Sequence, residues 1–276
     1  AIWVVFQHGI KQLSRFGELI QTLPSNPWTI GNSNSQFRFP RGVALDRAGK
    51  LYVSDSGNHR VQVYDVSGGA PVYHSTIGET GVAGSDNSHF RFPGHVAVDS
   101  SNRLYVADRD NARVQRCTWS GSWSCSTFHG TGTAGAGPDQ LNDAEGVAVD
   151  SAGNVWIADG GNGRVKRCSA AGSCTVFASG LGVPTDVGAA SDGVVYVSDW
   201  SRHVVWRFAA NGSALGAFAG VPGIPYLTNA SLFNGPAGVA VAPDGSLYVL
   251  ENPGYRLLKQ DAAGQPLWSV GQAGVP

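Results

Sequence analysis

The feature that most limits how this chain can fold is a motif that recurs five times along it. Each copy contains a short apolar segment such as residues 40–46, a turn rich in Gly or Asn, and a second apolar segment such as residues 51–55. An acidic residue ends the second segment, and these acids are spaced 53, 51, 40 and 52 residues apart: Asp55, Asp108, Asp159, Asp199 and Glu251. Such repetition indicates stacked copies of one supersecondary unit.

Each copy predicts four short antiparallel strands. The two apolar segments precede a third strand, for example residues 60–64, and a fourth, for example residues 71–77. Four strands in about 40–50 residues are typical of one blade of a β-propeller. A single blade leaves both of its faces uncovered, so the blades must pack against one another. The 38 Gly residues suit the many tight turns that this all-β fold needs.

The two ends of the chain complete the predicted propeller. Residues 1–38 read as a partial closing blade, with strands at 2–6, 11–16 and 18–23 and no innermost strand. Residues 39–276 supply five full blades, so we expect six blades in a single domain spanning residues 1–276. The alternative is a five-bladed ring to which residues 1–38 form an extension.

The motif resembles a known repeat. Pro-x-Gly-Val-Ala-Val-Asp followed by Leu-Tyr-Val-x-Asp-x-x-Asn-x-Arg-Val is similar to the NHL repeat family, most clearly at residues 37–65, and the resemblance extends over residues 36–270. It implies a β-propeller, but NHL propellers serve as enzymes, sensor domains and binding platforms alike.

The four cysteines form two close pairs that bracket Gly/Ser-rich turns, Cys117 with Cys125 and Cys168 with Cys174. Cysteines that face each other across a hairpin can form disulfides, whereas no His accompanies either pair to complete a metal site. Disulfides indicate an oxidising compartment. Two sequons at Asn211 and Asn229 agree with secretion and are candidate N-glycosylation sites. The chain contains no Met, even at position 1, which we expect of a mature secreted chain or a fragment.

Functional residues are expected where the repeats differ. Asp, Asn and Arg recur after the second strand of several copies, so we assign them to the scaffold. In a propeller the starts of the first strands and the turns between second and third strands share one face, where they surround a central channel. The candidate ligand-binding residues there are Arg41, His95, Glu145, Asp186, His59, Arg109, Trp200, His203 and Tyr255. The alternative is a solvated channel mouth with ordinary polar residues.

A second resemblance concerns catalysis. Residues 107–113 are similar to part of the peptidyl-hydroxyglycine lyases, and this resemblance implies a Zn²⁺ ion held by channel histidines. Here only His95 lies at such a position, one residue later than in that family's pattern. Glu145, Asp186 and His95 are therefore the candidate metal ligands, for Zn²⁺ or, through carboxylate oxygens, for Ca²⁺.

The remaining features restrict the partners. A net charge of −1 does not favour nucleic-acid binding, and the apolar runs are too short to span a membrane. Trp119 and Trp123 either contact a sugar or partner or pack on a neighbouring blade. We predict a secreted module that binds protein or glycan partners, or that self-assembles through the open edge of the partial blade. The alternative is a metal-dependent lyase or hydrolase with its site at the channel mouth.

Overall fold

The computed structural model describes residues 2–6, 8–24, 29–219, 233–252 and 256–271. Within these residues, strands β1 to β23 form six antiparallel sheets, which are the blades of a six-bladed β-propeller. The predicted fold class is therefore confirmed. The chain divides into two compact units, Ala1–Val147 and Ala148–Pro276, with the boundary inside strand β12. Among the described helices, none has the length and apolar character to cross a lipid bilayer.

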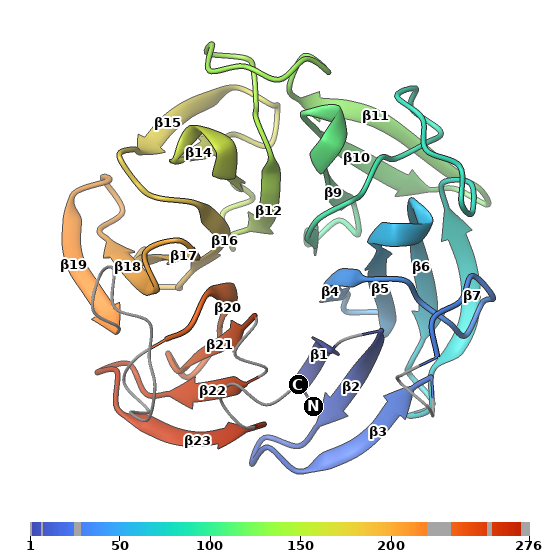
Figure 1. Cartoon of the computed structure of the whole chain (residues 1–276), viewed down its shortest axis with the longest axis horizontal. Coiled ribbons are helices and arrows are strands. Elements are labelled where there is room, and N and C mark those ends of the chain that lie inside the picture. The colour runs from blue at the N-terminus through green and yellow to red at the C-terminus, as the bar shows by residue number, and fades with distance from the viewer. Residues whose placement is uncertain (1, 7, 25–28, 220–232, 253–255, 272–276) are drawn as a thin grey trace. The chain divides into compact units, whose positions relative to one another are not determined.

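The first unit contains one three-stranded and two four-stranded sheets, in which strands adjacent in sequence are also hydrogen-bonded neighbours (Figure 1). Its strands are β1 (Ile2–Phe6), β2 (Gly9–Leu13) and β3 (Leu19–Leu23); β4 (Pro40–Leu45), β5 (Lys50–Asp55), β6 (Arg60–Asp65) and β7 (Val72–Ile77); and β8 (Val96–Val98), β9 (Leu104–Asp108), β10 (Arg113–Trp119) and β11 (Trp123–His129).

The second unit follows the same plan in three four-stranded sheets, except that the first strand of the first sheet, β12, crosses the boundary and has residues 144–147 in the first unit. Its strands are β12 (Ala144–Val149), β13 (Val155–Asp159), β14 (Arg164–Cys168) and β15 (Cys174–Ala178); β16 (Pro184–Ala189), β17 (Val195–Asp199), β18 (Val204–Phe208) and β19 (Ala214–Ala219); and β20 (Pro236–Val241), β21 (Leu247–Glu251), β22 (Leu257–Gln260) and β23 (Pro266–Val270).

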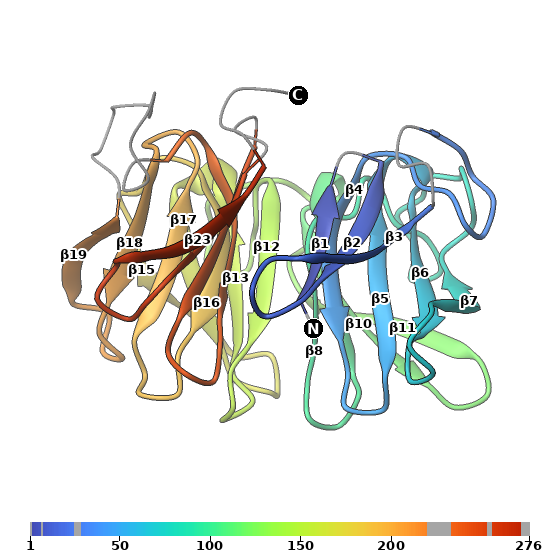
Figure 2. The same cartoon turned by 90° about the horizontal axis from the view of Figure 1, so that it is seen from below.

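The N-terminal sheet is the predicted partial blade. In the described part of the chain, β1 pairs only with β2 (Figure 2). Strand β1 packs against β4, just as the second strand β5 packs against β8 and β17 against β20. It therefore occupies the second-strand position, as the sequence predicts. Strand β2 ends at Leu13 rather than at residue 16, because Gly17 N–H donates to the Ser14 carbonyl and closes a turn.

The second strands β5 and β9 of the first unit contain apolar side chains that are fully buried. Leu51 and Val53 of β5 and Val106 of β9 have no exposed surface. One core cluster joins Val61 and Val63 of one blade to residues of the next, including Leu104 and Val106. Burying such side chains stabilises the packing by about 1.5–3 kcal/mol each.

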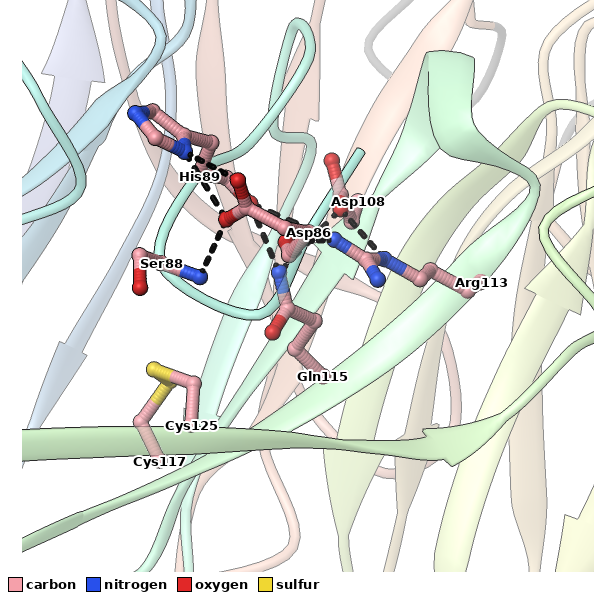
Figure 3. Close-up of a disulfide and its surroundings, with 8 residues drawn as sticks. All are labelled: Asp86, Ser88, His89, Asp108, Arg113, Gln115, Cys117 and Cys125. Atoms are coloured by element: carbon pink, nitrogen blue, oxygen red, sulfur yellow. Dashed lines mark hydrogen bonds and ion pairs between the residues drawn. A yellow bond between two sulfur atoms is a disulfide. The ribbon is translucent and has the colours of Figure 1, made fainter. Parts of the chain in front are cut away.

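A buried ionic network closes the turn between β9 and β10, the second and third strands of their blade. Asp108, which has no exposed surface, ends β9 and accepts hydrogen bonds from Nε of Arg113 at 2.8 Å and from the Asn111 amide at 2.9 Å. Arg113 and Gln115 also donate to carbonyls of the preceding loop, at Asp86 and His89 (Figure 3). The network therefore fastens the turn to the loop that leads in from the previous blade.

The same network recurs with small variations. Asp55 accepts from Arg60 Nε at 2.8 Å, Asp159 from Arg164 at 2.7 Å and Glu251 from Arg256 at 2.9 Å. Asp199 instead accepts from the indole N–H of Trp206 at 3.1 Å. The scaffold role expected for these acids agrees with their burial and with their hydrogen bonds.

Both predicted disulfides are present. Cys117 joins Cys125 across the β10–β11 hairpin, and Cys168 joins Cys174 across the β14–β15 hairpin. In each hairpin the two cysteines are directly opposed in register. The described residues contain no free cysteine.

Removing one partner of the buried ion pair tests its contribution to stability. The Asp108→Ala substitution leaves the guanidinium of Arg113 buried without its carboxylate, so we expect the free energy of unfolding to fall by about 3–5 kcal/mol. Urea denaturation measures this loss. The control is Arg47→Ala at an exposed position in the turn after β4, with an expected change of about 0.5 kcal/mol or less. Equal losses in the two variants would contradict the assignment.

Removing a disulfide tests the hairpin cross-links. The Cys168→Ser/Cys174→Ser double variant should lose about 2–3 kcal/mol in free energy of unfolding, because the closed loop no longer restricts the unfolded chain. The same urea experiment under non-reducing conditions measures it. A variant as stable as the parent chain would show that this cross-link contributes nothing to the folded state.

Candidate functional site

A cluster of ion pairs forms in the first unit where the repeats differ. Glu145 at the start of β12 accepts two hydrogen bonds from Nη1 of Arg41, at 3.0 and 2.8 Å. It also accepts one from Nη1 of Arg109 at 3.0 Å. Arg109 lies 3.2 Å from a carboxylate oxygen of Asp143 and donates to Asp110 at 3.0 Å. Three of the predicted site residues are therefore in direct contact.

The repeat positions these side chains. Arg41 and Glu145 each stand second in the first strand of a blade, in β4 and β12. Arg109 opens the 3-10 helix η2 (Arg109–Asn111), directly after the buried Asp108. The residue equivalent to Arg41 in the blade between them is Gly94. A Cβ atom at Gly94 would lie only 2.4 Å from the carbonyl oxygen of Glu145, so a side chain there would block the approach of β12.

His95 is connected to the strand of Glu145 through a backbone hydrogen bond. Its N–H donates to the Glu145 carbonyl at 2.8 Å, and its own carbonyl accepts from Ala107 N–H at 3.1 Å. These bonds fix the start of β8 between the neighbouring strands.

Charge and partial burial determine the ionisation of the cluster. The Glu145 side chain is only 12% exposed. Burial opposes the charge of Arg109, but the carboxylates of Glu145, Asp110 and Asp143 outweigh it and raise the pKa of Arg109. Burial, together with the nearby charge of Glu145, raises the pKa of Asp143. Each arginine of the cluster is therefore paired with at least one carboxylate.

This donor set does not fit a metal ion. Two guanidinium groups engage the oxygens of Glu145, and their positive charge would repel a cation at the same position. In the portion of the chain that the structure describes, no group of three or more His, Cys, Asp and Glu residues is placed to hold a metal.

Two exposed aromatic residues beside the cluster were not among the sequence candidates. Phe39 immediately precedes β4, and Phe92 has the equivalent place in the repeat, four residues before β8 begins; their side chains are 53% and 39% exposed. Both have left-handed backbone conformations, with φ of 49° and 47°. The ring of Phe92 lies 4.5 Å from that of His59, and its N–H donates to His59 Nδ1 at 3.2 Å. Burial lowers the pKa of His59, in agreement with an imidazole nitrogen that accepts a hydrogen bond.

These aromatic residues adjoin the ion pairs. Phe39 lies two residues before Arg41, and Asp110 N–H donates to the carbonyl of Arg91, next to Phe92. We call the combined group the first-strand surface. It consists of Phe39, Arg41, His59, Phe92, Arg109, Asp110, Asp143 and Glu145.

The other candidates lie elsewhere or outside the described residues. Asp186, in the second unit, is buried and accepts from Val239 N–H at 3.0 Å. His203 Nδ1 accepts from Gly235 N–H at 3.0 Å, and Trp200 Nε1 donates to the Asn252 carbonyl at 2.8 Å. Tyr255 and Asn229 lie outside the described residues. The convergence of both units' candidates on one channel stays a prediction.

Asn211, the other sequon, is exposed in the turn between β18 and β19. Its side-chain oxygen accepts hydrogen bonds from both the backbone and the hydroxyl of Ser213. The turn therefore presents the sequon at the surface.

Comparison with known proteins supports the sequence resemblance. The NHL repeat model matches residues 37–64, 90–117 and 141–168. NHL repeat-containing protein 3 of Homo sapiens is 29% identical over 158 residues, covering 50% of this chain and 43% of that protein. Peptidyl-glycine alpha-amidating monooxygenase A of Xenopus laevis is 25% identical over 254 residues, covering 90% of this chain and 27% of that protein. The chain thus spans less than half the length of either relative.

A solved structure shares the fold. A chain in the crystal structure of a nidogen/laminin complex superimposes with a TM-score of 0.71 and 15% sequence identity, covering 97% of this chain and 91% of that one. The repeat matches and the six described blades agree: the chain contains NHL repeats and folds as a β-propeller of the NHL type.

Proposed function

We propose that this chain is an extracellular protein-binding module and that its first-strand surface contacts the partner. The NHL propeller is a fold that generally supports protein binding. The observation that carries the proposal is a pair of exposed phenylalanines, Phe39 and Phe92. They lie beside a cluster in which arginines form ion pairs with carboxylates. Aromatic residues and Arg are the types enriched in protein interfaces.

The backbone at these phenylalanines supports a functional role. A bulky residue in the left-handed region costs about 1–3 kcal/mol, and such strain concentrates at functional sites. At the equivalent position before β20 the chain has Gly235, with φ of 58°, where that conformation carries no steric cost. Phe39 and Phe92 thus keep an apolar ring exposed where glycine would be less strained, which is expected if the rings contact a partner.

The state of Glu145 favours recognition over acid–base chemistry at this surface. Its carboxylate is occupied by two guanidinium groups, so it is poorly placed to take a proton from a substrate. Fixed, paired charges instead give an interface its orientation and specificity.

An extracellular location is supported by the two disulfides, which persist in oxidising compartments. The exposed sequon at Asn211 agrees with it. The fold shared with a chain of a nidogen/laminin complex is a further, fold-level argument for a protein partner. Self-assembly through β1 is included in this proposal, because among the described residues β1 pairs only with β2, and an unpaired edge can accept a strand.

Site-specific cross-linking tests the binding surface. With a photoreactive phenylalanine analogue at position 39 or 92, we expect both positions to capture the same protein from an extracellular-matrix extract. The same analogue at position 215, where Leu215 is 47% exposed on β19, is the control and should not capture it. Mass spectrometry identifies the captured chain, and light scattering across a concentration series shows whether a second copy is the partner. Equal capture from position 215 would contradict the assignment to the first-strand surface.

Removing the aromatic ring at one of the two positions should also weaken capture of the partner from the other position. We expect Phe39→Ala to reduce capture from position 92 by about tenfold, the usual loss when an interface anchor is removed.

The alternative is a metal-dependent lyase or hydrolase, which the similarity to peptidyl-glycine alpha-amidating monooxygenase A favours. Elemental analysis of the purified chain separates the two. The binding module predicts well below one Zn²⁺ or Ca²⁺ per chain. A stoichiometric metal that is lost in the Glu145→Gln variant would contradict the binding proposal and support the enzyme.

A further inference from the structure

A groove lies in the first unit between β7 and the β10–β11 hairpin. Its volume is about 490 Å³, within the range of small-ligand sites. The end of β7, the loop that follows it and the tip of the hairpin line the groove. The lining residues are Ser75, Thr76, Ile77, Gly78, Asn87, Ser88, Trp119, Gly121, Ser122, Trp123, Ser124 and Cys125.

The two tryptophans of the hairpin have different roles. Trp123 is anchored, since its Nε1 donates to Ser75 Oγ at 2.9 Å and its ring lies 6.0 Å from that of the buried Tyr52. Trp119 is 46% exposed. The rings of Trp123 and His74 each lie 5.2 Å from the Trp119 ring and support it. Of the two roles open from sequence, Trp123 therefore packs on the neighbouring blade, whereas Trp119 offers indole surface to a ligand.

The disulfide holds this arrangement in place. Cys117 is bonded to Cys125 (Figure 3). Two positions farther toward the tip of the same hairpin, Trp119 is paired with Trp123 in the strand register. The cross-linked hairpin β14–β15 of the next blade has Ser169-Ala170-Ala171-Gly172-Ser173 between its cysteines and no aromatic residue. The disulfide is thus common to both hairpins, and the tryptophans distinguish one of them.

The lining selects a particular ligand chemistry. Among the described residues that line the groove, none is Asp, Glu, Lys or Arg, so the lining itself carries no formal charge. The one large aliphatic side chain, Ile77, is only 3% exposed and offers little apolar surface. What remains accessible is an indole face together with hydroxyls and an amide, including Asn87, Ser88 and Ser122. Hydroxyl and amide groups both donate and accept hydrogen bonds.

We propose that this groove binds a neutral saccharide, with a sugar ring stacked on Trp119 and its hydroxyls hydrogen-bonded to the serines and Asn87. A sugar ring has an apolar face of C–H groups that suits an indole and a rim of hydroxyls that suits uncharged polar side chains. This inference goes beyond the proposed protein-binding function, because it concerns another surface and another class of ligand. Each can fail without the other.

An oligosaccharide array tests the proposal. The whole chain is applied to immobilised neutral, sialylated and sulfated oligosaccharides and to a random peptide library, and hits are titrated by calorimetry. We expect a neutral oligosaccharide to bind, and Trp119→Ala to weaken that binding by about tenfold. The control is Phe16→Ala, an exposed aromatic residue (65%) of the same unit that does not line the groove. Its affinity should match that of the parent chain.

The remaining outcomes overturn the proposal. They are failure of the parent chain to bind any neutral oligosaccharide, binding confined to acidic oligosaccharides or to peptides, and equal affinity of the Trp119→Ala and Phe16→Ala variants. Urea denaturation checks that Trp119→Ala keeps the parent stability, as expected for an exposed side chain. If that variant unfolds, the test uses the parent chain instead. The parent chain is titrated with the oligosaccharide that bound on the array, and tryptophan fluorescence monitors the binding. An unchanged emission spectrum at saturation would then refute stacking on Trp119.

Discussion

The buried pair of an acid and an arginine at the end of the second strand is the interaction on which the rest of the structure depends. Asp108 has no exposed surface, and its oxygens accept from the side chains of Asn111, Arg113 and Gln115 and from the backbone N–H of Arg91. One carboxylate thereby joins a strand end, a turn and the incoming loop. Because the charges are buried and paired, losing one partner leaves the other unsatisfied in a low-dielectric environment.

The same interaction positions the first-strand surface. The residue directly after Asp108 is Arg109, which reaches Glu145, and the loop fastened by Asp108 contains Phe92. The repeated residues hold a rigid scaffold, and the residues that differ between repeats lie at its edges. This division gives two surfaces of different chemistry, one of arginines and phenylalanines and one of an indole with hydroxyls, both on the first unit.

Most of the fold was predictable because each blade repeats one pattern. The alternation of apolar residues and the recurring acids placed the strands, and the spacing of the cysteines placed both disulfides. The sequence placed Arg41 and Glu145 at equivalent positions of the repeat, but it did not predict the ion pair that they form. Phe39 and Phe92 were missed because a residue before proline is expected to be extended, whereas both are left-handed. The different roles of Trp119 and Trp123 depend on Ser75 and Tyr52 of another blade, which no local pattern reveals.

The central claim is that residues shared by the repeats hold the fold while divergent residues bind. It is tested most directly by the free energy of unfolding of a Phe92→Gly variant. Glycine relieves the left-handed backbone, and the ring is 39% exposed, so the account predicts a stability equal to or above that of the parent chain. A loss greater than about 1 kcal/mol would contradict it, because Phe92 would then be part of the scaffold rather than a residue kept for recognition.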